Sequence, residues 1–385
     1  MIAFKEIIYL DNNATTPIDK RVLEAMLPFL TDNFANASST HNFGLQANEA
    51  VKAARKKVAD LIGAEQNEIV FTSGATEAIN LAIKGVAENY SAKGKHIVTV
   101  ATEHSSVLDT CKHLETKGYE VTYLPVNSFG LIDLNELKNV LGADTILVCV
   151  MYANNETGVI QPVKDIAQLT HDAGALYMCD ATQAVGKISV DVDALGIDLM
   201  CMSGHKLYAP KGAGALYVRQ RMNRVKLPAF IHGGGHENGL RSGTLNVPSI
   251  VALGSACEIS QQEMKQDAER ISTLRNELEN ELLKIAGTFA NGKTENRIFN
   301  TTNICFRGTD ANVMIGRMKN VAVSNGSACS SAVFEPSHVL TAMGLPDDDA
   351  FASIRFSLGK FNTTNEVKVV VKIFNELYQS SIKYA

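Results

Sequence analysis

The sequence contains no run of about 18 uninterrupted apolar residues, the length that a membrane-spanning helix needs. Residues 1–6 lack the features of a signal peptide. There is no excess of basic residues either, since 36 Lys and Arg stand against 41 Asp and Glu, for a net charge of -5. These absences argue against a membrane protein and against a general nucleic-acid surface. We expect a soluble, cytoplasmic protein that binds neither a membrane nor nucleic acid directly.

Cysteine is sparse, and its seven residues follow no disulfide or metal-binding spacing. An odd number without such a framework is typical of a reducing compartment. His232 and His236 stand four residues apart, but the three glycines between them exclude the helix that would aim both rings at one ion. We therefore expect no bound metal.

One cysteine differs from the other six in its surroundings. Six lie in or beside apolar or amphipathic stretches, where a thiol packs as a small apolar side chain. Cys329 instead lies among small residues in a predicted loop over 324–334. Such a loop is often only a connection, but a thiol that it carries can also act as a nucleophile. Cys329 is a candidate catalytic residue.

The pattern of apolar runs predicts an α/β protein. Strands alternate with helical segments through the first two-thirds of the chain, and their apolar runs are continuous rather than alternating, which indicates a largely parallel sheet covered by helices on both faces. Seven strands are predicted, at residues 68–72, 96–100, 121–124, 145–151, 175–179, 197–202 and 214–218.

The pattern changes after about residue 255, and 385 residues exceed one core of ordinary size. Apolar residues at helical spacing predict one long helix over 261–285. Strands over 302–306 and 353–357 and a last helix over 365–382 give an α+β pattern. We predict a large domain over 15–257 and a smaller domain formed by 1–14 and 258–385.

Three features indicate a cofactor site. Asp180 and Lys206 each follow a predicted buried strand, and ligands of open α/β sheets bind at the carboxyl ends of strands. The turn over 73–76 comes between a strand and a helix, where backbone N–H groups bind anions. Taken singly, these features also describe a surface lysine, a helix-capping acid and an ordinary capped helix start. Together they are what pyridoxal 5'-phosphate (PLP) requires: an amine for its aldehyde, a carboxylate for its ring nitrogen and a phosphate anchor.

The sequence resembles the PLP-dependent cysteine desulfurases of the class V aminotransferase superfamily. The likeness runs in order along nearly the whole chain, through segments 9–17, 73–77, 154–158, 180–183, 203–206, 233–237, 241–244, 327–329 and 355–359. It implies the type I fold of PLP-dependent transferases, with a mainly parallel seven-stranded sheet and a smaller α+β domain. It also implies a homodimer.

The resemblance implies a role for each matched residue. Lys206 binds the cofactor aldehyde, Asp180 pairs with the pyridine nitrogen, Gln183 bonds the phenolic oxygen and His104 stacks on the ring. The phosphate site is formed by Gly74, Ala75, Thr76, Ser203 and His205, with Thr244 reaching the phosphate of the neighbouring subunit. Asn155, which also contributes to the cofactor site, and Arg355 hold the substrate carboxylate.

The reaction implied is conversion of L-cysteine to L-alanine, with transfer of the sulfur to Cys329 as a persulfide and then to an acceptor protein. The acceptor could serve iron–sulfur cluster assembly, tRNA thiolation or DNA phosphorothioation. A selenocysteine lyase, or another class V aminotransferase, would share the cofactor site. A sulfur-relay or scaffold protein without catalysis would have no use for Lys206, Asp180 and His104 together.

Overall fold

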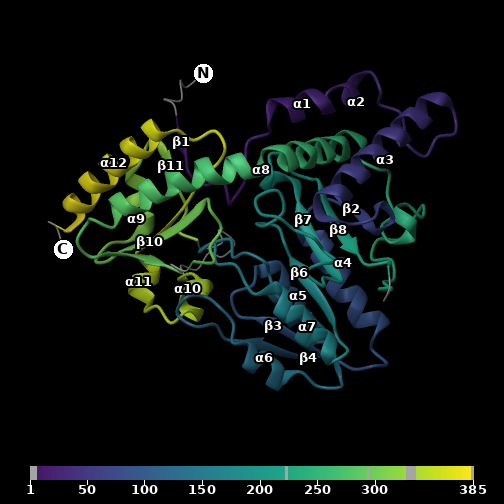
Figure 1. Cartoon of the computed structure of the whole chain (residues 1–385), viewed down its shortest axis with the longest axis horizontal. Helices are drawn as coiled ribbons and strands as arrows, with labels where there is room; N and C mark the ends of the chain where they lie inside the picture. Colours follow the sequence, from purple (N-terminus) through teal and green to yellow (C-terminus); the bar gives the residue numbers. More distant parts are fainter. Residues whose placement is uncertain (1–6, 222–223, 293–294, 327–334, 383–385) are drawn as a thin grey trace.

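The computed structural model describes residues 7–221, 224–292, 295–326 and 335–382. Its larger body is built on a seven-stranded sheet of order β2-β8-β7-β6-β5-β3-β4 (Figure 1). The strands are β2 (Ile69–Thr72), β3 (His96–Val100), β4 (Glu120–Leu124), β5 (Thr145–Cys149), β6 (Leu176–Asp180), β7 (Leu199–Ser203) and β8 (Gly214–Val218). Neighbours are parallel, except that β8 runs antiparallel to both β2 and β7. The predicted α/β class and mainly parallel sheet are confirmed.

Helices cover both faces of this sheet because its strands are buried on both sides. Successive side chains of a strand point to opposite faces, so that Val148 of β5 lies in one apolar core and Leu147 in the other. The first core includes residues of α3 (Asn42–Ile62) and α7 (Val163–Asp172), and the second includes those of α4 (Ala75–Asn89) and α5 (Ser105–Glu115). The larger body also contains α1 (Lys20–Met26), α2 (Pro28–Thr31) and α6 (Leu134–Val140).

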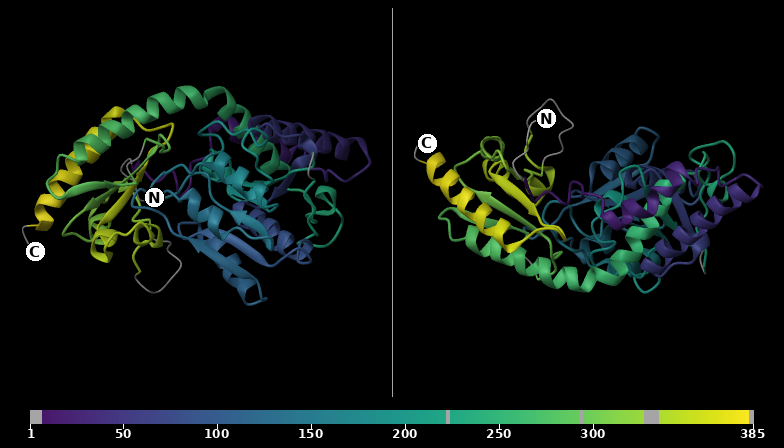
Figure 2. Two further views of the ribbon diagram at one scale, coloured as in Figure 1. Left: turned by 60° about the horizontal axis from the view of Figure 1, so that its bottom comes forward. Right: turned by 90° about the horizontal axis from the view of Figure 1, so that it is seen from above.

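One long helix, α8 (Val247–Leu282), belongs to both bodies (Figure 2). Its first half packs Ile250 and Leu253 into the core that contains α3, whereas Ile271 and Leu278 lie in the core of the smaller body. The predicted helix over 261–285 is therefore real but begins earlier. The domain boundary predicted after residue 257 falls inside this continuous helix.

The smaller body combines a three-stranded antiparallel sheet of order β12-β10-β9 with the parallel pair β1-β11. Its strands are β1 (Ile8–Tyr9), β9 (Thr288–Asn291), β10 (Thr301–Phe306), β11 (Val321–Ala322) and β12 (Ser353–Ser357), and its helices are α9 (Ala311–Arg317), α10 (His338–Ala342), α11 (Asp347–Phe351) and α12 (Thr364–Ile382). Ile8 and Leu10 are buried in this core. The predicted α+β pattern is confirmed; β1, β9 and β11 were too short to show a periodicity. Over the described ranges, no helix is both long and apolar enough to cross a membrane.

Candidate active site

The candidate site lies at the carboxyl ends of β6 and β7. Strand β6 ends at Asp180, and β7 ends at Ser203, which is followed by the 3-10 turn η2 (Gly204–Lys206). The two strands are parallel neighbours, and Asp180 pairs in register with Cys201. The sheet therefore brings Asp180 and Lys206 to one edge, as the sequence predicted.

The amine of Lys206 is hydrogen-bonded to the segment between β1 and α1. Its Nζ donates hydrogen bonds to the backbone carbonyls of Asn13 and Ala14, over 2.6 and 2.7 Å. Burial, and then the positive charge of Arg355, lowers the pKa of Lys206 to about 8 against the opposing effect of two nearby carboxylates. At neutral pH a larger fraction of this amine is unprotonated than in an ordinary lysine, which suits a nucleophile.

Asp180 and His104 lie beside this amine. Asp180 is 8% exposed, and its Oδ1 accepts hydrogen bonds from the Thr182 N–H at 2.9 Å and from the Cys201 thiol at 3.2 Å. His104 precedes α5, where its Nδ1 accepts from the Ser106 N–H at 3.1 Å. Burial lowers the pKa of His104, and the charge of Lys206 acts in the same direction, while Asp180 opposes both. The ring remains accessible to solvent, so it can face a bound ligand.

The first turn of α4, with Ser203 beside it, is the predicted anion cradle. Gly74 precedes this helix with a φ of 156°, which L side chains rarely adopt, and a Cβ added there would lie 3.5 Å from the Ser203 Oγ. The whole of α4 lies within the described residues, and no side chain caps its N-terminus. The N–H groups of Ala75 and Thr76 are therefore at the positive end of the helix dipole without a capping side chain. The sequence predicts a phosphate site at this turn, and the free N–H groups are consistent with that prediction.

The other residues predicted for the cofactor have their own partners. Gln183 donates from Nε2 to the Asn13 carbonyl at 2.9 Å and accepts from the Lys187 amine at 2.5 Å. His205 has its Nδ1 3.2 Å from the Thr15 Oγ1. Burial, followed by the charge of Lys206, lowers the pKa of His205 to about 4, so its imidazole is neutral at pH 7.

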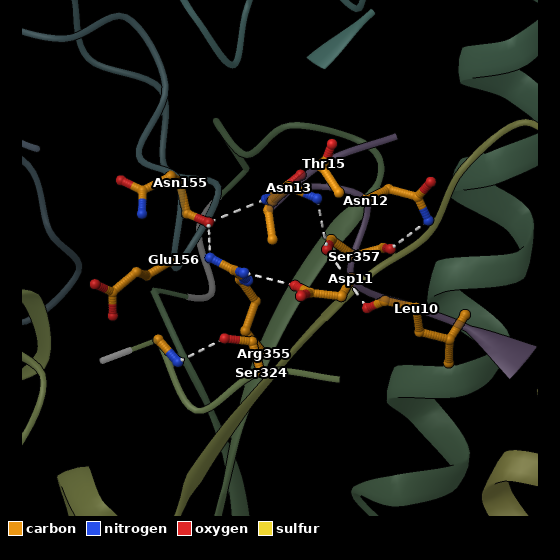
Figure 3. Close-up of polar contacts among 12 residues, drawn as sticks. Leu10, Asp11, Asn12, Asn13, Thr15, Asn155, Glu156, Ser324, Arg355 and Ser357 are labelled. Carbon is orange, nitrogen blue, oxygen red and sulfur yellow. Dashed lines mark hydrogen bonds and ion pairs between the residues drawn. The ribbon is translucent and has the colours of Figure 1, made fainter. Parts of the chain in front are cut away.

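The Arg355 guanidinium is engaged by two groups of the chain itself (Figure 3). It donates to the backbone carbonyl of Asn155 at 3.0 Å and to the Asp11 Oδ1 at 2.7 Å. Arg355 is 5% exposed, and its Nε is buried without a partner among the described residues. The Asn155 side-chain amide points away from Arg355 in Figure 3. The predicted pair is therefore brought together, but through the backbone of Asn155.

Two predicted residues stand apart from this cluster. Thr244 is exposed, and its segment is tied to the first turn of α4 by an ion pair of 2.8 Å between Arg241 and Glu77. Cys329 lies outside the described residues. The other six cysteines are buried, as expected from their apolar surroundings. Burial raises their pKa values, to about 12 for Cys257, so these thiols are poor nucleophiles.

Comparison with known proteins identifies the family. The model of the aminotransferase class-V family matches residues 8–370. The chain belongs to the aminotransferase class-V family. A cysteine desulfurase IscS of Anaeromyxobacter sp. (strain K) is 51% identical over 371 residues, which cover 96% of this chain and 92% of that protein.

Two solved structures of family relatives have the same fold. The structure of a NifS-like protein superimposes with a TM-score of 0.91 at 38% identity, covering 97% of this chain and all of that one (100%). The structure of SspA in complex with cysteine gives a TM-score of 0.81 at 38% identity, covering 92% of this chain and 100% of that one. The likeness extends over both bodies of the molecule.

Enzymes of this class-V family depend on PLP, and the residues of this site fit that cofactor. Gly74, whose added Cβ would face the Ser203 Oγ at 3.5 Å, precedes an uncapped helix start, which leaves backbone N–H groups for a phosphate. The buried carboxylate of Asp180 is oriented by two donors. The amine of Lys206 has a lowered pKa. Anion cradle, acid and amine are thus present together.

The sequence did not identify the partners that hold these groups in place. Asp11 pairs with Arg355, and the Asn13 carbonyl accepts from both Lys206 and Gln183. Both residues lie in segment 9–17, which was noted only for its resemblance. Their position in the polar run Asp11-Asn12-Asn13 was the available signal, but the sequence does not say which groups they meet.

Proposed function

We propose that this protein is a PLP-dependent cysteine desulfurase that converts L-cysteine to L-alanine and takes up the sulfur on Cys329. The observation that carries the proposal is the 51% identity, over 96% of the chain, to a protein named cysteine desulfurase. The geometry supports it, because Lys206, Asp180 and His104 gather at one sheet edge. Cysteine as the bound molecule in the SspA structure supports the substrate.

The cofactor would be held by the groups described above. Lys206 would bind its aldehyde, Asp180 its pyridine nitrogen and Gln183 its phenolic oxygen, with His104 against the ring. Its phosphate would be bound by Gly74, Ala75, Thr76, Ser203 and His205, and Asn155 would line the same site. When bound, PLP supplies an electron sink that draws electron density from the substrate Cα.

The protein itself positions the substrate and moves protons. Arg355 binds the L-cysteine carboxylate through its planar fork of N–H groups, with Asn155 beside it. The Nζ of Lys206 accepts the Cα proton, since its lowered pKa leaves it a competent base near neutral pH. His104, a neutral imidazole beside Lys206, carries a proton between the substrate and solvent.

Sulfur transfer is assigned to the thiolate of Cys329. Its sulfur attacks the sulfur of L-cysteine, so that an S–S bond forms while the substrate C–S bond breaks. The substrate carbon takes up a proton and leaves as L-alanine. No external oxidant is needed, because the carbon is reduced as the sulfur is oxidised. The persulfide then passes to a protein acceptor for iron–sulfur cluster assembly, tRNA thiolation or DNA phosphorothioation.

A homodimer completes the proposed site, with Thr244 of one chain reaching the phosphate bound by the other. Exposed large apolar side chains concentrate in residues 18–45, namely Ile18, Leu23, Leu27, Leu30, Phe34 and Leu45. An exposed apolar group of this size is typical of an interaction surface. The free thiols suit the reducing cytoplasm, where we propose that the enzyme works.

Three purified holoenzymes test this function: the unmodified protein, Lys206→Ala and Cys329→Ala. With L-cysteine, the first should form L-alanine and a persulfide on Cys329, measured by amino-acid analysis and peptide mass spectrometry. Lys206→Ala should form neither, and Cys329→Ala should form no persulfide. Lys211→Ala, at an exposed lysine nearby, and Cys257→Ala, at a buried cysteine, are matched controls.

Two results would contradict the proposal. Absence of alanine from the unmodified protein loaded with PLP would exclude a desulfurase. Full alanine formation by Cys329→Ala would exclude the assigned thiol. Parallel assays with L-selenocysteine distinguish a selenocysteine lyase, which would release selenide but no sulfide.

A further inference from the structure

Glu156 is a buried carboxylate that the proposed mechanism does not use. It is 2% exposed and lies in a turn that Asn154 holds rigidly, with the Asn154 Oδ1 accepting from the Glu156 N–H at 2.8 Å and from the Thr157 N–H at 3.0 Å. This turn belongs to the larger body. Burying a carboxylate costs free energy unless it is paired or hydrogen-bonded, and the side chain of Glu156 meets two residues of the smaller body.

The first contact is with Gly326. A Cβ added to Gly326 would collide with the Glu156 Oε2, and the φ of 79° at Gly326 also favours glycine. Two residues earlier, Ser324 pairs with the backbone of Arg355 through hydrogen bonds of 2.6 and 3.3 Å. The chain is thus hydrogen-bonded to Arg355 at Ser324 (Figure 3) and lies against Glu156 at Gly326.

The second contact is with Ser337, which also caps α10. The Ser337 Oγ donates to the same Glu156 Oε2 over 2.5 Å, and it accepts from the Leu340 N–H at 3.2 Å. The next residue, His338, has its Nε2 2.9 Å from the Glu103 carbonyl, directly before His104. One oxygen of Glu156 therefore meets the chain both before and after residues 327–334.

We propose that Glu156 is a positioning residue that fixes Gly326 and Ser337, and thereby the two ends of the segment that carries Cys329, beside the carboxylate-binding Arg355. The inference rests on the proposed function. Cys329 follows Gly326 by three residues and precedes Ser337 by eight, so displacing Gly326 or Ser337 displaces a point from which the chain leads to the thiol. Because a near-attack geometry is lost with displacements of about 1 Å, sulfur transfer should depend on Glu156 while substrate binding should not.

The test compares the holoenzyme with Ser337→Ala, Glu156→Ala and Glu156→Gln. Ser337→Ala removes the hydroxyl donor, and Glu156→Ala removes the acceptor. Glu156→Gln keeps an oxygen that Ser337 can reach and is the rescue variant. Asp133→Ala is the control for loss of a helix cap, because Asp133 caps α6 in the larger body by accepting from the Asn135 N–H at 2.7 Å.

Two readouts separate positioning from general damage. The kcat for persulfide formation should fall about tenfold or more in both alanine variants, with the KM for L-cysteine and the PLP content within about twofold of the unmodified protein. Chymotryptic cleavage after Leu340, a buried residue of the helix that Ser337 caps, followed by mass spectrometry, should accelerate about tenfold. In kcat and in cleavage rate, Glu156→Gln should stay within about threefold of the unmodified protein, and Asp133→Ala should match it.

The inference is wrong if both alanine variants keep the original kcat and cleavage rate, or if KM rises while kcat stays constant. Either result leaves the proposed function intact, provided that the unmodified enzyme still makes alanine and persulfide. A completely inactive unmodified enzyme would instead overturn the function. Because Ser337→Ala only deletes a hydroxyl, it tests the contact even where Glu156→Ala fails to fold.

Discussion

The Arg355 guanidinium is bound to the Asp11 carboxylate at 2.7 Å, with 6% and 19% of the two side chains exposed. Asp11 occupies one arm of the fork that is proposed to bind the carboxylate of L-cysteine. A charge-assisted hydrogen bond of this kind is short and strong, and breaking it without a replacement leaves a buried charge unpaired. The substrate carboxylate must therefore compete with Asp11 for Arg355.

Asp11→Asn tests this competition. The amide keeps the size of the side chain but removes its charge, so Arg355 loses a competitor and the substrate carboxylate loses a repulsive neighbour. The KM for L-cysteine should fall about threefold to tenfold in steady-state assays. Asp349→Asn, at an ion pair with Arg307 on the smaller body, should leave KM unchanged. A higher KM in Asp11→Asn would mean that Asp11 orients Arg355 rather than competes with the substrate.

The lowered pKa of Lys206, about 8, predicts how cofactor-free protein takes up PLP. Only the unprotonated amine attacks an aldehyde, and its fraction rises about tenfold per pH unit below 8 and levels off above it. The rate of PLP uptake, measured by stopped-flow absorbance between pH 6.5 and 9.5, should follow this curve. The reaction of PLP with N-acetyl-lysine amide is the reference for an ordinary lysine. If the protein's rate instead kept climbing through pH 9.5 in constant ratio to that of the reference, Lys206 would have the pKa of an ordinary lysine.

Gly74 should determine the affinity for the cofactor phosphate. In Gly74→Ala, the φ of 156° becomes strained and a methyl group faces the Ser203 Oγ. We expect the dissociation constant of PLP to rise about tenfold or more, measured by equilibrium dialysis of cofactor-free protein. Gly212→Ala is the matched control, because Gly212 also has a positive φ but its added Cβ meets nothing within 4 Å. Equal losses in both variants would indicate backbone strain alone.

Lys187 is buried beside the site and donates to Gln183 at 2.5 Å. Burial, with the nearby charges of Lys206 and Arg355, lowers its pKa to about 7. Between pH 7 and the ordinary lysine range, the unfolded chain binds more protons than the folded one, so stability rises with pH. Lys187→Met should remove on the order of 2 kcal/mol of this rise between pH 7 and 9.

Urea unfolding of cofactor-free protein at several pH values measures that rise. Lys211→Met, at an exposed lysine, should keep the full pH dependence. If Lys187→Met kept it as well, the charge of Lys187 would already be compensated in the folded protein.

The sheet and its site could be predicted because both follow from local patterns. Continuous apolar runs identify the parallel strands, and a polar residue directly after a buried strand, such as Asp180, must lie at the sheet edge. The antiparallel direction of β8 was not predictable, since its apolar run reads the same in either direction. The early start of α8 was missed because residues 247–257 are apolar or small on several sides and show no single stripe.

Side-chain partners far apart in the sequence could not be predicted. Asp11 meets Arg355 and Glu156 meets Ser337, with sequence separations of 344 and 181. The first contact depends on how distant segments pack within the smaller body, and the second on how that body docks on the larger one. No spacing in the chain encodes such contacts, so only the folded structure identifies them.

The exposed apolar side chains of residues 18–45 predict the effect of splitting the proposed homodimer. Leu30 and Phe34 are 54% and 69% exposed, and a charge placed there would be buried without a partner in the dimer. The double variant Leu30→Glu/Phe34→Glu should therefore halve the mass measured by light scattering, whereas Phe129→Glu, at a site 52% exposed elsewhere, should not. Because Thr244 would then be missing from the neighbouring site, PLP affinity should fall by the same factor as in Thr244→Val. If the monomeric double variant kept the PLP affinity of the unmodified protein, Thr244 of the neighbouring chain would not contribute to the cofactor site.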